Sequence, residues 1–179
     1  IKSTLPDIIF TSSLNNQNIL KKRRYYKDVK ILNIGKINQS NLNKIRLRKQ
    51  KICLLCPEGL YEETIKMINF FKNFKIKNNF EFILRLHPDL EKKRETIFKK
   101  IKNFENIKIT ISENKLEKDL KNAKFGIYTG SSIVFNMTQH GVYPIFLQNT
   151  FSDISLDPLQ FFKNKKIIKV SNQIQLENI

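Results

Sequence analysis

Two hydrophobic patterns alternate along this chain. Short apolar runs rich in β-branched residues are separated by longer segments in which apolar residues recur every three or four positions. The runs that we expect to be strands span residues 7–13, 29–34, 51–56, 80–86, 106–111, 125–130, 143–147 and 166–170. Strands that alternate with helical segments are typical of a parallel sheet with crossover helices.

The longer segments also carry signals for where helices begin and end. The expected helices span residues 61–74, 89–104, 115–123 and 131–140. We expect Asn114 to open the third helix as the N-cap of a capping box with Glu117, and Gly141 to end the fourth. The pattern therefore predicts an α/β fold in which a Rossmann-like parallel sheet is flanked by helices.

The first fifty residues differ in organisation from the rest. Residues 32–50 lack a strong period and separate the opening of the chain from the main series of strands. We expect residues 1–50 to form an opening strand–helix–strand with a connector, and residues 51–179 to form the Rossmann-like domain. Because the chain starts at Ile1 and enters a strand pattern almost at once, we expect it to be a piece of a longer protein.

Composition adds a strongly basic charge. The formal net charge is +17, and the run KKRRYYKDVK at 21–30 concentrates part of it. Positive charge of this size attracts nucleic acids and anionic membranes. The lysines are nevertheless spread along the whole chain, and the abundance of Lys, Ile and Asn is what an AT-rich genome would encode. We expect no nucleic-acid partner, while a peripheral membrane contact stays open.

Cys53 and Cys56 form a CxxC pair, a spacing that can indicate redox or zinc chemistry. Here the pair lies in an apolar strand, in which residues i and i+3 face opposite sides of the sheet. We therefore expect two reduced core cysteines and no metal site. Reduced thiols fit a cytoplasmic protein, with contact at the inner face of the cell membrane as the open alternative.

Candidate functional residues gather where three of the expected strands end. They are Glu58 and Gly59 at the end of strand 51–56, Arg85, His87 and Pro88 at the end of strand 80–86, and Thr129, Gly130, Ser131 and Ser132 at the end of strand 125–130. Ligands of open parallel sheets bind at the carboxyl ends of the strands. A glycine that permits a tight turn, followed by serines at a helix start, could hold an anion there.

Each of these signals has a simpler structural explanation. A serine at a helix start is often only a cap, a histidine at a strand end is often only hydrogen-bonded structure, and Glu58 could merely interact with its helix dipole. The conjunction of a carboxylate, a histidine and a Gly-Ser-Ser turn at one edge of one sheet favours a site.

The order Glu58-Gly59, His87-Pro88 and Ser131-Ser132 resembles the acidic-Gly, His-Pro and Ser-Ser motifs of bacterial sialyltransferases and polysialyltransferases. Related signatures occur in capsule glycosyltransferases and in polymerases that use CDP-glycerol. The wider stretch YTGSSIVFNMTQHGVYPIFL is similar to the nucleotide-sugar half of GT-B enzymes. The resemblance covers about residues 51 to 160, and Pro57 stands where those families usually have a second acid.

The resemblance implies the nucleotide-binding half of a GT-B glycosyltransferase, with residues 1–50 as the edge of a missing N-terminal half or as the crossover. It implies a nucleotide-sugar donor, such as a CMP-sugar, and no cofactor. The sugar would be sialic-acid-like and the acceptor a glycan or lipid-linked glycan of a capsule or lipopolysaccharide. Gly59, Arg85, Pro88, Thr129, Gly130, Ser131 and Ser132 would bind the substrate or its nucleotide.

The chemistry of glycosyl transfer assigns roles to the same residues. The acceptor hydroxyl must lose a proton, for which Glu58 is the well-placed carboxylate, and the leaving phosphate needs stabilisation by His87 and the Ser131-Ser132 turn. Because no Asp-x-Asp pair stands at a strand end, we expect metal-independent chemistry. We expect Asp157 only to cap a short helix that starts at Pro158.

Two other classes of function remain open on the same scaffold. One is a CDP-polyol phosphotransferase or a nucleotide-sugar epimerase or hydrolase. The other is a basic, Rossmann-like RNA-binding module, for which the positive charge would be the functional feature.

Overall fold

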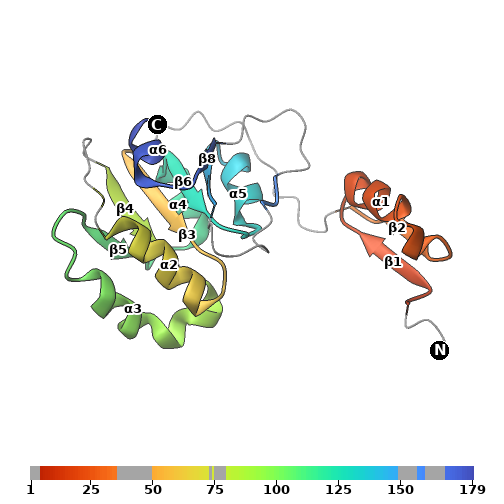
Figure 1. The fold of residues 1–179 in the computed structure, drawn as a ribbon, viewed down its shortest axis with the longest axis horizontal. Helices are drawn as coiled ribbons and strands as arrows, with labels where there is room; N and C mark the ends of the chain where they lie inside the picture. The colour runs from red at the N-terminus through yellow and green to blue at the C-terminus, as the bar shows by residue number, and fades with distance from the viewer. Residues whose placement is uncertain (1–4, 36–49, 73, 75–79, 149–156, 160–167) are drawn as a thin grey trace. The chain divides into compact units, whose positions relative to one another are not determined.

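The computed structural model describes residues 5–35, 50–72, 74, 80–148, 157–159 and 168–179. The chain divides into two compact units, Ile1–Asn43 and Lys44–Ile179 (Figure 1). Most of the predicted connector lies outside the described residues.

The first unit is a strand–helix–strand. Its elements are β1 (Ile8–Thr11), α1 (Leu14–Lys21), the 3-10 helix η1 (Arg24–Tyr26) and β2 (Lys30–Asn33). β1 and β2 pair in parallel, and the side chain of Ser13 caps α1 by accepting the N–H of Asn16 at 3.1 Å. The opening strand–helix–strand predicted from the sequence is present.

The second unit is a doubly wound α/β domain. Its elements are β3 (Ile52–Cys56), α2 (Tyr61–Phe71), β4 (Glu81–Leu84), η2 (Pro88–Lys93), α3 (Arg94–Ile101), β5 (Ile109–Ile111), α4 (Leu116–Asn122), β6 (Phe125–Tyr128), α5 (Ile133–Gln139), β7 (Tyr143–Leu147), β8 (Ile168–Val170) and α6 (Gln173–Glu177). The six strands are parallel in the order β5-β4-β3-β6-β7-β8. This is the strand order 3-2-1-4-5-6 of Rossmann folds, so the predicted fold class is confirmed.

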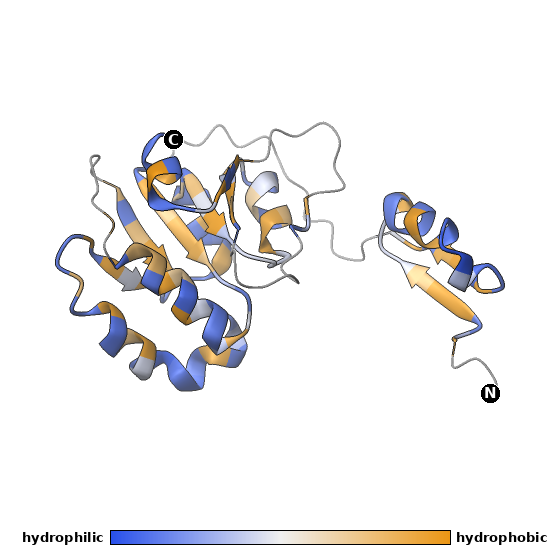
Figure 2. Cartoon of the chain, viewed as in Figure 1, coloured by the Kyte–Doolittle hydropathy of each residue, from blue (hydrophilic) through white to orange (hydrophobic). Residues whose placement is uncertain are grey.

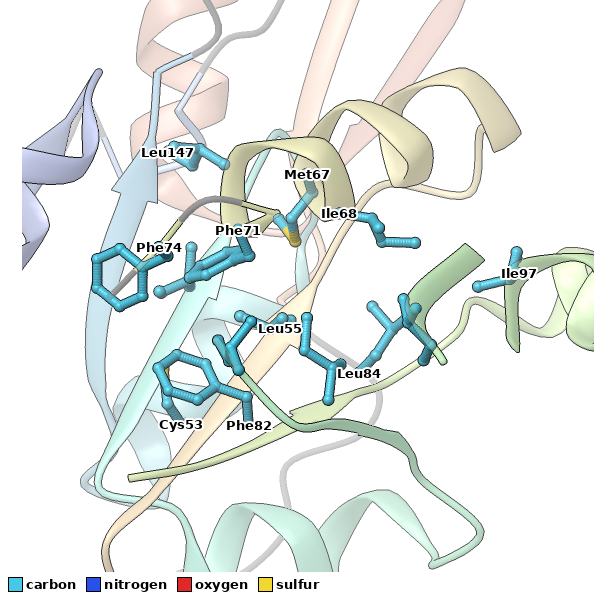
Figure 3. Packing of buried hydrophobic residues seen from close by; sticks show 14 of the residues in the cluster. Cys53, Leu55, Met67, Ile68, Phe71, Phe74, Phe82, Leu84, Ile97 and Leu147 are labelled. Atoms are coloured by element: carbon cyan, nitrogen blue, oxygen red, sulfur yellow. The ribbon is translucent and has the colours of Figure 1, made fainter. Parts of the chain in front are cut away.

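The sheet is buried on both faces, as parallel sheets are. One apolar cluster joins Leu55, Phe82 and Leu84 to Phe71 of α2 and Ile97 of α3 (Figure 3). The cluster on the other face packs the sheet against α4 and α5. In Figure 2 the strands are largely hydrophobic, whereas the helices carry hydrophilic residues as well.

Cys53 and Cys56 are free, buried thiols. They belong to the clusters on opposite faces of the sheet, as the alternation of the strand predicted. Burial raises the pKa of both thiols, that of Cys56 to about 12. No group of three or more His, Cys, Asp or Glu side chains suited to a metal ion occurs among the described residues.

Two helix ends test the expected stop and start signals. Gly141 follows α5 with φ +65°, as predicted for a helix-ending glycine. The predicted capping box is wrong, because α4 has Lys115 at its N-cap and no side-chain cap bond. The side-chain amide of Asn114 instead donates to Oδ1 of Asp119 at 3.1 Å, since that buried carboxylate requires donors.

Within the described residues, no helix is long and apolar enough to cross a membrane.

Candidate functional site

The carboxyl ends of β3 and β6 are adjacent in the sheet and lead to opposite faces. α2 follows β3 and packs on one apolar cluster, whereas α5 follows β6 and packs on the other. Such a reversal of winding is the topological switch point, where doubly wound folds place their ligands. The Glu58-Gly59 turn and the Thr129–Ser132 turn both begin here.

Glu58 joins the two turns at the switch point. Its backbone N–H donates to Oγ1 of buried Thr129 at 3.1 Å. Its carboxyl group lies over Gly130, so that a Cβ at Gly130 would collide with the Glu58 carboxyl. Gly130 has no positive φ. The predicted tight turn is present, since the N–H of Ser131 donates to the backbone oxygen of Thr129 across Gly130 at 2.6 Å. Room for the Glu58 side chain is a second reason for the glycine.

The carboxyl group of Glu58 is also electrostatically unusual. Desolvation by burial, and then the nearby charge of Glu63, raise the pKa of Glu58 above its ordinary value. Glu63 itself forms an ion pair with Lys66 at 2.7 Å. No ion pair of Glu58 occurs within the described part of the chain. A carboxylate with a raised pKa accepts a proton more readily than an ordinary glutamate does.

His87 lies on the other side of the Glu58-Gly59 turn. A Cβ at Gly59 would stand 2.9 Å from Nδ1 of His87, so the glycine makes room for the imidazole. The same Nδ1 caps η2 by accepting the N–H of Asp89 at 3.4 Å, and lies 3.3 Å from Oδ2 of Asp89. Pro88 occupies the first turn of η2. Both contacts use Nδ1, and the half-exposed ring keeps Nε2 for another partner.

Ser131 and Ser132 occupy the turn between β6 and α5. Ser131 Oγ accepts a long hydrogen bond of 3.4 Å from the N–H of Ile133. Ser132 is exposed, holds the N-cap position of α5 and makes no side-chain cap bond. The simpler explanation is that both serines serve only as helix caps. It accounts for Ser131 in part, but the Ser132 hydroxyl does not act as a cap.

Arg85 is occupied by a structural network. Its guanidinium donates to Oδ2 of Asp119 at 2.7 Å and to the backbone oxygen of Asn114 at 2.9 Å. The Asp119 side chain is 1% exposed and also accepts the Ser112 hydroxyl at 2.6 Å. Asp119 was missed in the sequence, because it lies between Lys118 and Leu120 in a short charged helix. Its partner neutralises Arg85, whose expected part in ligand binding stays a prediction.

A small polar cavity lies at the ends of β4 and β5. Its volume is about 150 Å³, and its lining is Arg85, Leu86, Glu91, Arg94, Ser112, Glu113 and Asn114. Arg94 lies 3.2 Å from the carboxylate of Glu91 and 3.6 Å from that of Glu113. The charges are thus largely compensated, so the cavity suits a polar neutral group better than an anion.

Asp157 has a second role besides the predicted cap. Its Oδ1 accepts the N–H of Leu159 at 2.9 Å, as a capping residue would, but most of the expected helix lies outside the described residues. The same oxygen accepts the hydroxyl of Tyr128 at 2.7 Å. Sequence reasoning gave no signal for this bond, which joins residues 29 positions apart.

The structure therefore brings Glu58, Gly59, His87 and the Thr129–Ser132 turn together at one sheet edge. Arg85 and Pro88 lie at the end of β4 beside them, and Arg85 is bound to Asp119. Whether these residues bind a nucleotide or act in catalysis stays a prediction.

Comparison with known proteins bears on the fold. No family model matches the chain, and no curated protein matches it. A solved structure of the GtfA/B complex, a glycosyltransferase, is similar with a TM-score of 0.52 at 11% sequence identity. The match covers 96% of this chain but 37% of the neighbour, so the chain spans little more than a third of that protein's length. At this identity the likeness concerns the fold alone.

Proposed function

We propose that this chain forms the donor-nucleotide part of a glycosyltransferase of the GT-B type. The observation that carries the proposal is the convergence of Glu58, His87 and the Thr129–Ser132 turn at the β3–β6 switch point. The fold neighbour is itself a glycosyltransferase, which supports the same class of reaction. The reaction of the whole protein is part of the proposal, because the chain spans 37% of that neighbour.

Glu58 is the general base in this proposal. Its carboxyl has a raised pKa and no ion-pair partner among the described residues, so it can take a proton from the acceptor hydroxyl as the new glycosidic bond forms. The hydrogen bond to Thr129 holds the backbone of Glu58 at the strand ends, and the carboxyl lies in the space that Gly130 leaves open. A base whose backbone is already in place needs less ordering during the reaction.

His87 and the two serines stabilise the leaving nucleotide. As the bond from the sugar to the phosphate oxygen breaks, negative charge grows on that phosphate. Nε2 of His87 and the hydroxyls of Ser131 and Ser132 are donors at the same sheet edge, where they can share this charge. The polar cavity at the ends of β4 and β5 has room for a planar part of the nucleotide.

The finer assignment rests on the motif resemblance. We propose a CMP-sugar with a sialic-acid-like sugar as donor, and a glycan or lipid-linked glycan of a capsule or lipopolysaccharide as acceptor. The reaction needs no metal in this proposal, because the three roles are filled by protein side chains. A peripheral contact with the inner face of the cell membrane would bring the enzyme to a lipid-linked acceptor.

A nucleotide panel tests the proposal. CMP, CDP, UDP and a polyanion such as heparin would be titrated into the protein by calorimetry at two salt concentrations, with and without EDTA. We expect one nucleotide to bind with a modest salt dependence and with no effect of EDTA. Tight binding of the polyanion with a steep salt slope, and of no nucleotide, would contradict the proposal and favour a nucleic-acid module.

A further inference from the structure

A buried acid lies beside the strand that leads into the site. The carboxyl of Asp157 belongs to a residue that is 3% exposed. Its Oδ1 accepts two hydrogen bonds, from the Tyr128 hydroxyl at 2.7 Å and from the Leu159 N–H at 2.9 Å. Its Oδ2 is buried and has no hydrogen-bond partner among the described residues.

Fold stability does not account for this pair. A buried polar atom without a partner is unfavourable, and the replacement of a buried polar pair by apolar side chains of similar shape is often neutral or stabilising. Tyr128 is 0% exposed and already packs its ring on Phe146, with ring centroids 5.5 Å apart. A phenylalanine would keep that packing. Unsatisfied buried groups of this kind require an explanation outside simple packing.

The position of Tyr128 links the pair to the site. Tyr128 is the last residue of β6 and pairs with Cys56, the last residue of β3. The next residue, Thr129, accepts the N–H of Glu58. The backbone of Tyr128 therefore lies at the point from which both turns of the site leave the sheet, and the hydrogen bond to Asp157 holds the other end of its side chain.

Tyr128 keeps its hydroxyl proton and so remains the donor of the hydrogen bond to Asp157. Burial, and then the hydrogen bond to Asp157, raise the pKa of Tyr128 above its ordinary value. The hydroxyl therefore stays protonated throughout the neutral and moderately alkaline range.

We infer that Asp157 is a positioning residue that acts through Tyr128 to fix the Thr129–Ser132 turn and, through Thr129, the backbone of Glu58. Asp157 touches no reacting atom in this scheme. It sets the place from which Glu58 and the two serines reach the ligand.

The backbone amide of Glu58 provides a direct readout, because its hydrogen bond to Thr129 reports the junction of the two turns. Hydrogen exchange of this amide would be measured by NMR in Tyr128→Phe, Asp157→Asn and the double variant Tyr128→Phe/Asp157→Leu. Ile97→Val is the matched control, since Ile97 is fully buried in the cluster on the opposite face. The comparison is made at equal distance below each variant's Tm.

We expect Tyr128→Phe to speed exchange at the Glu58 amide about fivefold, the factor that corresponds to one hydrogen bond of about 1 kcal/mol. Asp157→Asn keeps the Oδ1 acceptor and should leave the exchange rate unchanged. The double variant should regain thermal stability relative to Tyr128→Phe, because apolar packing replaces the lost bond. Its Glu58 amide should still exchange fast, because apolar packing does not fix the orientation of the residue 128 side chain as a directional hydrogen bond does. The Ile97→Val control should leave the rate unchanged.

Two results would overturn the inference. One is a double variant whose Glu58 amide exchanges at the wild-type rate, and the other is an Ile97→Val variant that accelerates it as much as Tyr128→Phe does. A second readout, the affinity for CMP or UDP, rests on the proposed function and should fall together with the amide protection. If the wild-type protein binds no nucleotide, the proposed function fails, and amide exchange alone decides the role of Asp157.

Discussion

At the scale of single residues, the structure shows burial and electrostatic surroundings of Glu58 that its place in the sequence does not predict. The sequence identifies a carboxylate at a strand end, and the raised pKa that supports its proposed role as a base comes from its surroundings. Burial and Glu63 raise its pKa, so the folded protein holds the Glu58 proton more tightly than the unfolded chain does. Above the raised pKa, the ionised form therefore lowers the stability of the fold.

Glu58→Gln should raise the Tm at neutral pH and lower turnover by about 10²-fold or more, because it removes both the buried charge and the base. The stability gain should vanish as the pH falls below the ordinary range of glutamate, where Glu58 is protonated in both states. Thermal scans from pH 3 to pH 8 and steady-state rates of the full-length enzyme measure these effects. Glu62→Gln, the same change at an exposed position of α2, is the control and should move neither. A Glu58→Gln variant with normal turnover would remove Glu58 from catalysis.

The glycines of the site allow a second test at this scale. Gly130→Ala should lower the free energy of unfolding by about 1 kcal/mol, because the new methyl group forces the Glu58 side chain into another rotamer. The double variant Gly130→Ala/Glu58→Ala should recover most of that loss, which urea denaturation measures as a coupling between the two positions. Independent, additive losses would mean that the Glu58 carboxyl does not lie against Gly130.

At the scale of elements, the sequence was informative wherever burial governs the pattern. The expected strands and the Gly141 helix end are present because apolar alternation and positive φ are local properties. The predicted capping box is absent, because the side-chain amide of Asn114 donates a hydrogen bond to Asp119 instead. Asp119 lies five residues away and, as a buried carboxylate, needs donors. The bonds of Arg85 to Asp119 and of Tyr128 to Asp157 join residues that are far apart in the sequence, so no local sequence pattern predicts them.

The Arg85–Asp119 pair gives the element-scale prediction. Arg85→Gln should lower the free energy of unfolding by about 3–5 kcal/mol, because it leaves the Asp119 charge buried without its cation. Arg85→Gln/Asp119→Asn should be more stable than Arg85→Gln alone, since the uncompensated charge is gone. Urea denaturation of the two variants measures the difference. Equal stabilities would show that the pair matters only for packing.

At the scale of the whole molecule, every residue that we place in the site belongs to the unit Lys44–Ile179. The strand order of that unit creates the switch point, and the six strands and both apolar clusters lie within it. The net charge of +17 is a property of the entire sequence and has no counterpart in the geometry of the site.

Residues 44–179, expressed alone, should therefore unfold cooperatively and bind the preferred nucleotide with a Kd within about threefold of that of the chain 1–179, since independent units contribute additively. Circular dichroism melts and calorimetry of both proteins provide the comparison. A loss of binding in a folded shorter chain would assign part of the nucleotide site to the first unit.

The two thiols of β3 can be used to follow the unfolding of the sheet, because each becomes reactive only when its face of the sheet is exposed. Cys53 reports one apolar layer and Cys56 the other, and both are shielded from thiol reagents by burial and by raised pKa values. Pulsed alkylation followed by mass spectrometry would time the exposure of each layer separately. Simultaneous labelling would mean that the layers separate in one event, whereas staggered labelling would order them without any added label.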